Sequence, residues 1–464
     1  MPPALTTAPR LFVDLRDIEL RENVVRTFHQ AEKPFRHPVL LQQAPWEKHP
    51  GMTASVIFDE EDGLFKAWYM AGFYDPPEHE HVQCTAISTD GIHWERPKLG
   101  LHEACGTKDT NIVIPSSYHD GQDHWETMLK DPLSEPGDPA LYKALGWSSY
   151  DWDGPLSGIY TAWSADGLTW EHPPEPVFHF HPRPGTDDLG PVGDAQSMMV
   201  DTLKKRYVAF LRTDATRSMS VSEDFIQWTQ PRPFLQALDD EETLYNNTGF
   251  VYGGQYLGFL THFDRNAFHQ TQCLRLLTSR DGETWNRPFA PPVVDIGGVG
   301  EWDRFQILLT GAPPVRVGDK LHIYYRGTPR RHNKVVGEFD PSIDPDQRRD
   351  FMAIGLATLR ADGFASIDAS YDGGWFVTRP LTLGGDRLFV NVVSDWGALV
   401  VEILDERGEP LPRYCRADAV PISADSVAEP VRFKDRRDLS ELSGRTVKLR
   451  FAMKNARVYS YWCE

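Results

Sequence analysis

Three aspartates lie beside short apolar runs at widely separated points of the chain. Asp131 precedes a proline, Asp194 is followed by an apolar run, and Asp303 lies between a tryptophan and an arginine. Cleaving a glycosidic bond needs one carboxyl group to protonate the leaving oxygen and a second to attack the anomeric carbon or activate water. We therefore predict these three aspartates as catalytic candidates. The reserve candidates are Glu47, Glu126 and Glu301.

A seven-residue phrase that recurs four times indicates which elements would position these acids. The copies are Ser88–Trp94, Ser164–Trp170, Ser222–Trp228 and Ser279–Trp285, and a degenerate fifth copy covers residues 359–364. The four full copies share Ser-x-Asp and a closing Trp, and β-rich runs precede them. Their aspartates, at positions 90, 166, 224 and 281, are 76, 58 and 57 residues apart. This period is typical of four-stranded propeller blades, so we predict an all-β, five-bladed β-propeller.

The first strand of each predicted blade begins with an unusually polar stretch. In a propeller these strands line a central funnel, so side chains from distant positions meet at one mouth. Aromatic faces beside paired donors and acceptors suit a small carbohydrate or oligosaccharide. The predicted substrate-binding residues are Glu47, His49, Trp125, Gln196, Asn246, Glu301, Trp302, Arg304, Arg326 and His332.

The pattern changes after residue 365, where alternating apolar runs continue without the repeated phrase. Their spacing predicts a C-terminal β-sandwich. We therefore expect a propeller over residues 1–366 and a sandwich over residues 367–464 that buttresses the blades. A weak helical period covers residues 17–30.

Composition narrows the classes of partner. A net charge of −19 disfavours binding to nucleic acid or to anionic membranes, because both bind positively charged protein surfaces. The N-terminus lacks a secretory pattern, so we expect a cytoplasmic protein. Five scattered cysteines, none in C-x-x-C spacing, predict neither a disulfide nor a zinc site. We assign no cofactor and no metal site, leave a structural divalent ion in the funnel open, and infer no oligomeric state.

Several phrases together resemble glycoside hydrolase family 32-like proteins of the five-bladed furanosidase group. They are the repeated phrase, residues 128–132 with 142–145, residues 193–196, residues 300–303 with 321–325, and the sandwich tail. The resemblance implies a propeller glycosidase acting on furanosides. It makes Lys130-Asp131-Pro132 the counterpart of an invertase Arg-Asp-Pro phrase, whose acid stabilises the transition state.

Two departures separate this chain from invertases. The Asn-Asp-Pro-Asn-Gly phrase of blade one is replaced by Trp46–Pro50, and the Glu-Cys phrase of blade three is absent, with Asp194-Ala-Gln196 in that region. The leading prediction is a glycoside hydrolase that releases a terminal sugar. The alternatives are a glycoside phosphorylase, for which the cationic run 326–334 would hold phosphate, and a non-catalytic carbohydrate-binding propeller.

Overall fold

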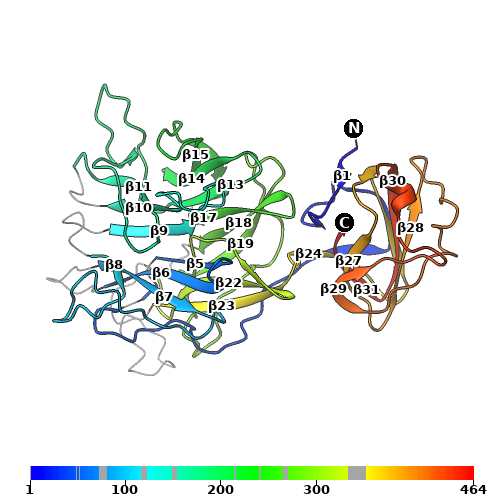
Figure 1. Ribbon diagram of the computed structural model, residues 1–464, viewed down its shortest axis with the longest axis horizontal. Coiled ribbons are helices and arrows are strands. Elements are labelled where there is room, and N and C mark those ends of the chain that lie inside the picture. Colours follow the sequence, from blue (N-terminus) through cyan, green and yellow to red (C-terminus); the bar gives the residue numbers. More distant parts are fainter. Residues whose placement is uncertain are drawn as a thin grey trace.

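The computed structural model describes residues 2–48, 50–51, 53–72, 81–115, 123–148, 154–213, 216–239, 242–264, 270–332 and 352–464. Within these ranges the chain forms β-strands and a single 3-10 turn, Ser440–Leu442, so the predicted all-β fold is confirmed. None of the described helices is long and apolar enough to cross a membrane. Figure 1 shows two bodies, a ring of blades and a sandwich, with both chain termini at the sandwich.

Five blades form the ring. Blade one is β5 (Ala54–Asp59), β6 (Leu64–Gly72), β7 (His81–Ser88) and β8 (Ile112–Ile114); blade two is β9 (Asp123–Lys130), β10 (Tyr142–Ser148), β11 (Gly158–Ser164) and β12 (Phe178–His179); blade three is β13 (Ser197–Asp201), β14 (Arg206–Thr213), β15 (Thr216–Ser222) and β16 (Arg232–Gln236). Blade four is β17 (Glu242–Tyr252), β18 (Gln255–Asp264) and β19 (Gln272–Ser279); blade five is β20 (Gln306–Leu309), β21 (Val315–Val317), β22 (Lys320–Thr328) and β23 (Ala353–Arg360). Isolated bridges complete the outer edges: Val294 pairs with Leu274 in blade four, and Glu32 and Leu40 pair with β23 in blade five.

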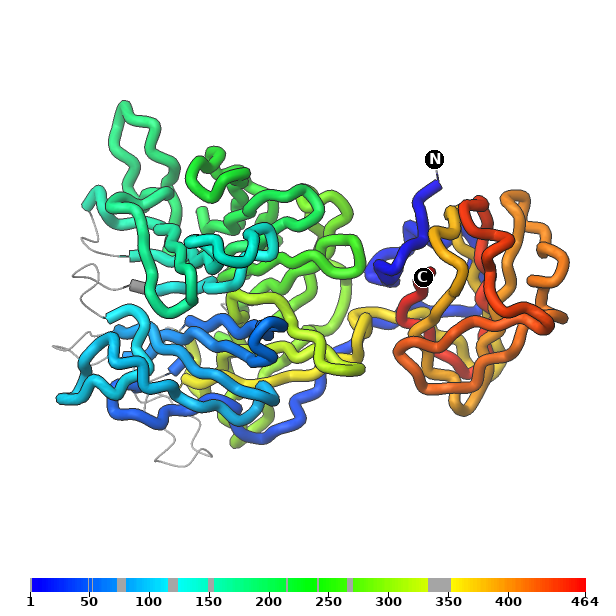
Figure 2. The backbone as a smooth tube through the Cα atoms, in the orientation of Figure 1, coloured from blue at the N-terminus to red at the C-terminus, as the bar shows by residue number. Residues whose placement is uncertain are grey.

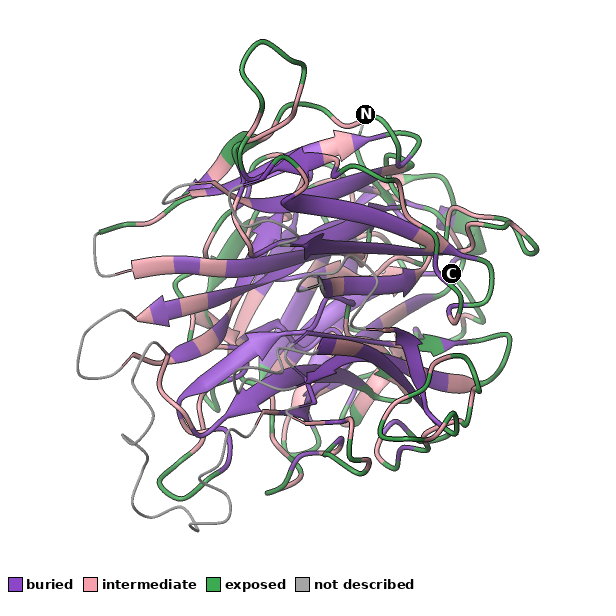
Figure 3. Ribbon diagram, turned by 90° about the vertical axis from the view of Figure 1, so that its left-hand side faces the viewer, coloured by how far each residue is buried: buried purple, intermediate pink, exposed green. Residues whose placement is uncertain are grey.

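Each inner strand is bonded to the inner strands or hairpins of its neighbours, which closes the ring. The five links, in blade order, are Met128 N to Ser55 Oγ (3.0 Å), Met198 N to Thr127 Oγ1 (3.1 Å), Ser197 Oγ to Asn247 O, Leu309 N to Thr261 Oγ1 (3.2 Å) and Gly311 N to Ala54 O (2.7 Å). Because buried polar groups must find partners, these bonds fix how the blades meet at the axis. The blade strands are mostly buried and the connecting loops exposed (Figure 3).

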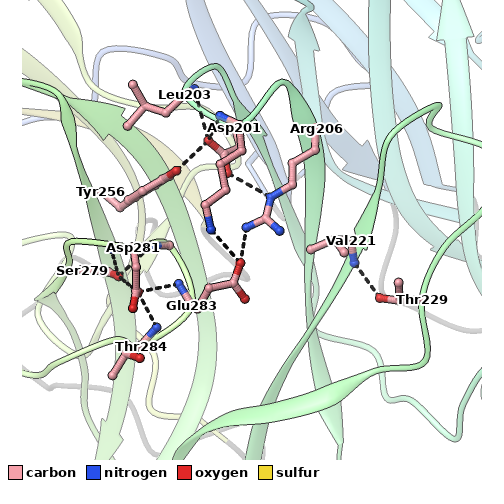
Figure 4. Close-up of polar contacts among 12 residues, drawn as sticks. Asp201, Leu203, Arg206, Val221, Thr229, Tyr256, Ser279, Asp281, Glu283 and Thr284 are labelled. Carbon is pink, nitrogen blue, oxygen red and sulfur yellow. Dashed lines mark hydrogen bonds and ion pairs between the residues drawn. The ribbon is translucent and has the colours of Figure 1, made fainter.

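The repeated phrase is a turn that closes the outer hairpin of blades one to four. In the first copy, Ser88 Oγ accepts from Gly91 N at 2.9 Å, and Asp90 Oδ1 accepts from the amides of Ile92 and His93 at 2.8 Å. The fourth copy repeats the pattern with Ser279 and Asp281 (Figure 4). These side chains accept hydrogen bonds from backbone amides of the turn, so the phrase has a structural role, as predicted.

A second repeated contact joins consecutive blades. An aspartate that ends an inner strand, or directly follows it, accepts a hydrogen bond from a tyrosine hydroxyl of the next blade and faces a cation of its own blade. The three sets are Asp59 with Tyr142 (2.9 Å) and Lys66 (2.8 Å), Asp131 with Tyr207 (2.6 Å) and Lys143 (3.2 Å), and Asp201 with Tyr256 (2.9 Å) and Arg206 (3.1 Å; Figure 4). We call these the seam aspartates.

The sandwich contains the two ends of the chain. One sheet holds β1 (Ala4–Leu5), β3 (Ile18–Glu22), β25 (Gly374–Thr378), β26 (Leu381–Leu383), β28 (Ala398–Leu404) and β30 (Thr446–Lys454). The other holds β2 (Arg10–Leu11), β4 (Val24–Phe28), β24 (Ala365–Ala369), β27 (Leu388–Val393), β29 (Asp425–Pro430) and β31 (Ala456–Cys463).

The N-terminal strands correct the predicted domain division. Residues 4–28 were expected in a propeller over residues 1–366, but all four of their strands pair with sandwich strands. The weak helical period over residues 17–30 is likewise wrong, because β3 and β4 occupy most of it. Only after residue 28 does the chain enter the propeller, where it covers the edge of blade five.

Candidate active site

Two inner strands carry a β-bulge at the propeller axis. In β9, Trp125 pairs with Gly146 and Thr127 with Leu145, which leaves Glu126 unpaired. In β17, Leu244 pairs with His262 and Asn246 with Thr261, which leaves Tyr245 unpaired. A bulge redirects a side chain and is frequent next to active sites. Glu126 and the Tyr245–Asn246 pair are thereby turned toward each other from blades two and four.

Glu126 contacts groups from several blades, which places it at the axis. Its Oε2 accepts a hydrogen bond from Asn246 Nδ2 of blade four at 2.8 Å and lies 3.9 Å from Arg326 Nη2 of blade five. Its backbone oxygen accepts from Ser55 Oγ of blade one at 3.3 Å. The Glu126 side chain is 11% exposed, so the carboxyl group is largely removed from water yet still reachable.

The environment of Glu126 favours its protonated form. Burial raises the pKa of Glu126 to about 7, helped by the charge of Asp194 and opposed by Arg326, Arg217 and the Asn246 hydrogen bond. Burial penalises a carboxylate, and a like charge nearby adds to that penalty. A glutamate of this kind keeps a proton to donate near neutral pH.

Asp194 supplies a second carboxylate from blade three. It lies just before β13, and its side chain is 45% exposed. Its Oδ1 forms an ion pair with Arg212 Nη1 at 3.1 Å. The site therefore holds two acids in contrasting settings: Glu126 is largely buried and is bonded through an amide, whereas Asp194 is open to solvent and paired with a cation.

Arg217 fixes the orientation of the Asn246 amide. This arginine of β15 is fully buried and donates to the side-chain oxygens of Asn246 (3.2 Å) and Asn247 (2.8 Å). It also donates to the backbone oxygens of Ala195 (2.8 Å) and Tyr245 (3.3 Å). Because Asn246 Oδ1 faces this guanidinium, its Nδ2 is left to donate to Glu126.

Aromatic rings flank the acids. Tyr245 meets the His332 ring edge-on at 5.1 Å, and His332 meets Phe263 at 4.7 Å. Burial, together with the charges of Asp194 and Glu126, raises the pKa of Tyr245 to about 12, so its hydroxyl remains a hydrogen-bond donor. Two residues before Glu126 in the chain, His124 stacks on Trp147 at 4.0 Å. Such faces can pack against a sugar ring.

Several of the predicted site residues meet in this cluster. They are Asp194, Gln196, Asn246, Arg326 and His332, together with the reserve acid Glu126. Gln196 is fully buried, and its backbone oxygen accepts from Asn246 Nδ2 at 3.2 Å. Gln196 therefore helps to position the Asn246 amide through its backbone oxygen.

Asp131 is not in the cluster, which corrects the assignment that the invertase resemblance favoured. It is a seam aspartate, 1% exposed, with Tyr207, Lys143, Ser134 and the amide of Leu133 around its carboxylate. It also follows Glu126 by five residues along β9, a separation of roughly 16 Å in a strand. Its carboxylate is committed to holding blade two against blade three.

Asp303 and its neighbours are also structural. Asp303 is 2% exposed and bonded to Lys33 Nζ and the Tyr325 hydroxyl, both at 2.7 Å. Trp302 stacks on Tyr325 within the core of blades four and five, and Arg304 lies over Phe305. Glu301 is exposed and accepts from Gly298 N in its own turn. Among the described residues, no hydrogen bond or ion pair joins any two of Asp131, Asp194 and Asp303.

Blade one contributes less to the site than predicted. Glu47 is fully buried, and its carboxylate accepts from the Tyr69 hydroxyl, Arg96 Nε and Asn111 Nδ2. In blade two, the predicted substrate-binding Trp125 also lies in the core, 2% exposed, with its ring against Gly146. His49 lies outside the described residues. Within the described ranges, no group of three or more His, Cys, Asp or Glu side chains is placed to hold a metal ion.

The sequence reasoning missed three residues of the cluster: Arg212, Arg217 and Tyr245. Arg212 and Arg217 lie in the second and third strands of blade three, where no opening phrase marks them. Tyr245 belongs to the polar stretch 244–247 that opens blade four, so a signal for it was present.

No protein-family model matches the chain, and no curated protein is significantly similar to it. Solved structures with a similar course of the chain include a glycosyl hydrolase from Bacteroides ovatus, at 12% identity and TM-score 0.49, covering 72% of this chain and 94% of that one. Another is an N-acetylgalactosamine deacetylase from F. plautii in complex with blood group B trisaccharide, at 15% identity and TM-score 0.46, covering 73% and 96%. A third comes from the GH130 family of mannoside phosphorylases, which contains glycoside hydrolases that target β-1,2 mannosidic linkages in Candida mannan, at 13% identity and TM-score 0.46, covering 72% and 94%.

None of these comparisons singles out family 32, so the resemblance to family 32-like proteins stays a prediction. The fold of this chain follows from its own strand pairing. The roles of its residues follow from the contacts described above.

Proposed function

We propose that the protein is a glycoside hydrolase in which Glu126 is the general acid and Asp194 the second carboxylate. The arrangement that supports this most is the largely buried Glu126 on a bulge of β9, bonded to Asn246 at 2.8 Å and within electrostatic reach of Asp194, whose charge and the burial raise the pKa of Glu126 to about 7. Two carboxyl groups with contrasting environments are what acid-assisted cleavage of a glycosidic bond requires.

In the proposed reaction, the Glu126 carboxyl proton passes to the glycosidic oxygen as the bond from that oxygen to the anomeric carbon breaks. Asp194 completes the substitution in one of two ways. It takes a proton from the water that attacks the anomeric carbon, or it attacks that carbon itself and forms a glycosyl ester, which water then hydrolyses while the deprotonated Glu126 takes the proton of that water. Asn246 holds Oε2 of Glu126 at 2.8 Å, which fixes the carboxyl group for this transfer. The substrate class is a small carbohydrate whose ring packs against Tyr245 and His332.

A glycoside phosphorylase is the second candidate, favoured by the cations around the acids. Arg326 Nη2 lies 3.9 Å from Glu126, and Arg212 is paired with Asp194 at 3.1 Å. His332 lies within the electrostatic reach of both Arg212 and Asp194. A phosphorylase uses one acid and replaces the attacking water by phosphate, which arginines bind well. In that reaction Asp194 would not act as a base.

The test is incubation with a panel of natural and chromogenic glycosides, with and without inorganic phosphate, followed by chromatography of the products. Phosphate-independent release of a free sugar is the expected result. A sugar phosphate formed only when phosphate is present would replace the hydrolase by the phosphorylase. Thermal stabilisation by a sugar without any product would reject both enzymes in favour of a carbohydrate-binding propeller.

A further inference from the structure

A cavity of about 210 Å³ lies at the junction of the propeller and the sandwich, away from the acids of the axis. Blade four forms one wall with Gln255, Thr278 and Asn286, and the N-terminal segment forms the other with Arg16 and Arg26. Figure 2 shows this segment (blue) running between the propeller and the sandwich. Two parts of the chain that are far apart in sequence therefore enclose one space.

An ion pair holds the two walls together. Arg280 donates from Nε and Nη2 to the two carboxylate oxygens of Asp14, at 2.8 and 2.7 Å, and Nη2 also contacts Asp17 at 3.2 Å. A bidentate pair of this kind fixes both distance and angle. Arg280 occupies the second position of the repeated phrase, where the other copies have Thr89, Ala165 and Glu223. The cation is therefore particular to blade four.

Three polar side chains of the cavity, those of Gln255, Thr278 and Asn286, are not bonded to other described residues. Gln255 is 4% exposed and Thr278 is 7% exposed. Among the described residues, neither of these side chains nor that of Asn286 forms a hydrogen bond. Asn286 is exposed. Buried amides and hydroxyls are nearly always paired, with protein or with ordered molecules, so the unpaired side chains of Gln255 and Thr278 in one cavity mark a place for a hydrogen-bonding ligand.

The cavity also has an excess of positive charge. Arg26 is half-buried and makes one hydrogen bond, to Val13 O at 3.1 Å, and its guanidinium lies over the Phe28 ring at 4.8 Å. A guanidinium has five N–H donors, so most of those of Arg26 remain for a ligand. Arg16 makes no side-chain hydrogen bond or ion pair with the described residues. Asp14 and Asp17 are already paired with Arg280.

We propose that this cavity is a second binding site, for a hydroxylated organic anion with the chemistry of a monosaccharide acid. The oxyanion meets Arg26, and the hydroxyls meet Gln255, Thr278 and Asn286. The volume is smaller than that of pockets for drug-sized ligands, which are roughly 300–1,000 Å³, and suits a single sugar ring. The site does not depend on the activity proposed for the axis.

The experiment is isothermal titration calorimetry of the full chain with D-glucuronate, with D-glucose as the neutral twin, and with sulfate as an oxyanion without hydroxyls. Glucuronate is expected to bind at least about tenfold more tightly than either control, because only glucuronate has both a carboxylate for Arg26 and hydroxyls for the side chains of blade four. Arg26→Gln is expected to weaken glucuronate binding about tenfold or more. The matched control Arg432→Gln removes an exposed charge of the sandwich and should leave binding unchanged.

Thr278→Val, which keeps the side-chain shape, provides a second variant and should weaken binding even if Arg26→Gln proves unstable. Asp194→Asn should keep full binding, because the cavity is separate from the axis. Equal binding of glucose or sulfate, or unchanged binding in both Arg26→Gln and Thr278→Val, would overturn the proposal. Loss of binding in Asp194→Asn would overturn the location.

Discussion

Asn246 donates a hydrogen bond of 2.8 Å to Oε2 of Glu126, across 120 residues of sequence. The bond joins the inner strands of blades two and four, each at its bulge. Behind it, the buried guanidinium of Arg217 fixes which end of the Asn246 amide faces the carboxyl group. An acid, its positioning amide and a buried cation thus form one chain of contacts at the axis.

The first prediction concerns the pH dependence of turnover. Because the pKa of Glu126 is about 7, the acid is protonated below neutral pH and loses its proton as the pH rises. We expect kcat to fall on the alkaline side with a midpoint near pH 7. Glu126→Gln should lower kcat by about 100-fold or more and remove this limb, measured with the substrate that the glycoside panel identifies. An unchanged limb in Glu126→Gln would assign it to another group.

The same group predicts how stability changes with pH. The pKa of Glu126 rises from 4.5 in an exposed glutamate to about 7 in the folded protein, so the folded state binds the proton more tightly than the unfolded state. Below pH 4.5 Glu126 is protonated in both the folded and the unfolded state, so its burial costs no stability. As the pH rises to 7 the unfolded state loses this proton first, and the folded state is destabilised by up to about 3 kcal/mol. Urea unfolding should show Glu126→Gln gaining stability over wild type across this window. Parallel curves for the two proteins would contradict the burial of the charge.

Arg217 is expected to tune Glu126. Its positive charge lowers the pKa of Glu126, so Arg217→Met should raise that pKa above about 7 and move the alkaline limb to higher pH. Arg217→Lys keeps the positive charge, so the pKa of Glu126 should stay close to its wild-type value, although a lysine cannot hydrogen-bond both asparagines in the same way. Carbon-13 NMR titration of the glutamate carboxyl reads this pKa without any substrate. A midpoint that stays at the wild-type pH in Arg217→Met would remove Arg217 from this role.

The seam aspartates are expected to affect stability and not chemistry. Asp131→Asn leaves the buried Lys143 without its carboxylate and should lower the free energy of unfolding by about 1–3 kcal/mol. Asp201→Asn removes the equivalent carboxylate between blades three and four and should behave alike. Activity per folded molecule should stay at the wild-type level in both. If Asp131→Asn alone abolished activity while remaining folded, Asp131 would return to the catalytic set.

The turn glycine of the first repeat offers a packing test. A Cβ on Gly91 would lie 2.2 Å from the Tyr324 hydroxyl oxygen, whereas one on Gly63 would meet nothing within 4 Å. Both glycines have a positive φ, of 73° and 66°, so both alanine variants pay a similar backbone cost of about 1 kcal/mol. Gly91→Ala should therefore be less stable than Gly63→Ala by about 1–3 kcal/mol in chemical unfolding. Equal losses of stability would show that the contact between Gly91 and the Tyr324 hydroxyl can relax.

The blades could be predicted from sequence because the repeated phrase performs local turn chemistry that its residues spell out. The N-terminal strands could not, because β1 and β2 have two residues each and their partners lie more than 370 residues away in the chain. Edge strands of this length leave no periodic signal.

The meeting of the blade openings at the candidate site was predictable, and the individual residues less so. Polar openings of blades two, three and four do converge, as expected. Glu126 was predicted only as a reserve acid, because the sequence of a strand does not show where it will bulge. The register shifts opposite Leu145 and Gly146 in the partner strand, and a Cβ on Gly146 would lie 2.7 Å from the Trp125 ring. Asp131 seemed catalytic by resemblance, whereas Asp59 and Asp201, which end the neighbouring inner strands, repeat its structural role.

The most direct measurement compares product release by wild type, Glu126→Gln and Asp131→Asn on the same glycoside, at pH 6 and without phosphate. Circular dichroism would confirm that each variant is folded. The expected result is that Asp131→Asn releases sugar at the wild-type rate while Glu126→Gln releases almost none. Wild-type release by a folded Glu126→Gln would contradict the assignment of Glu126 as the acid.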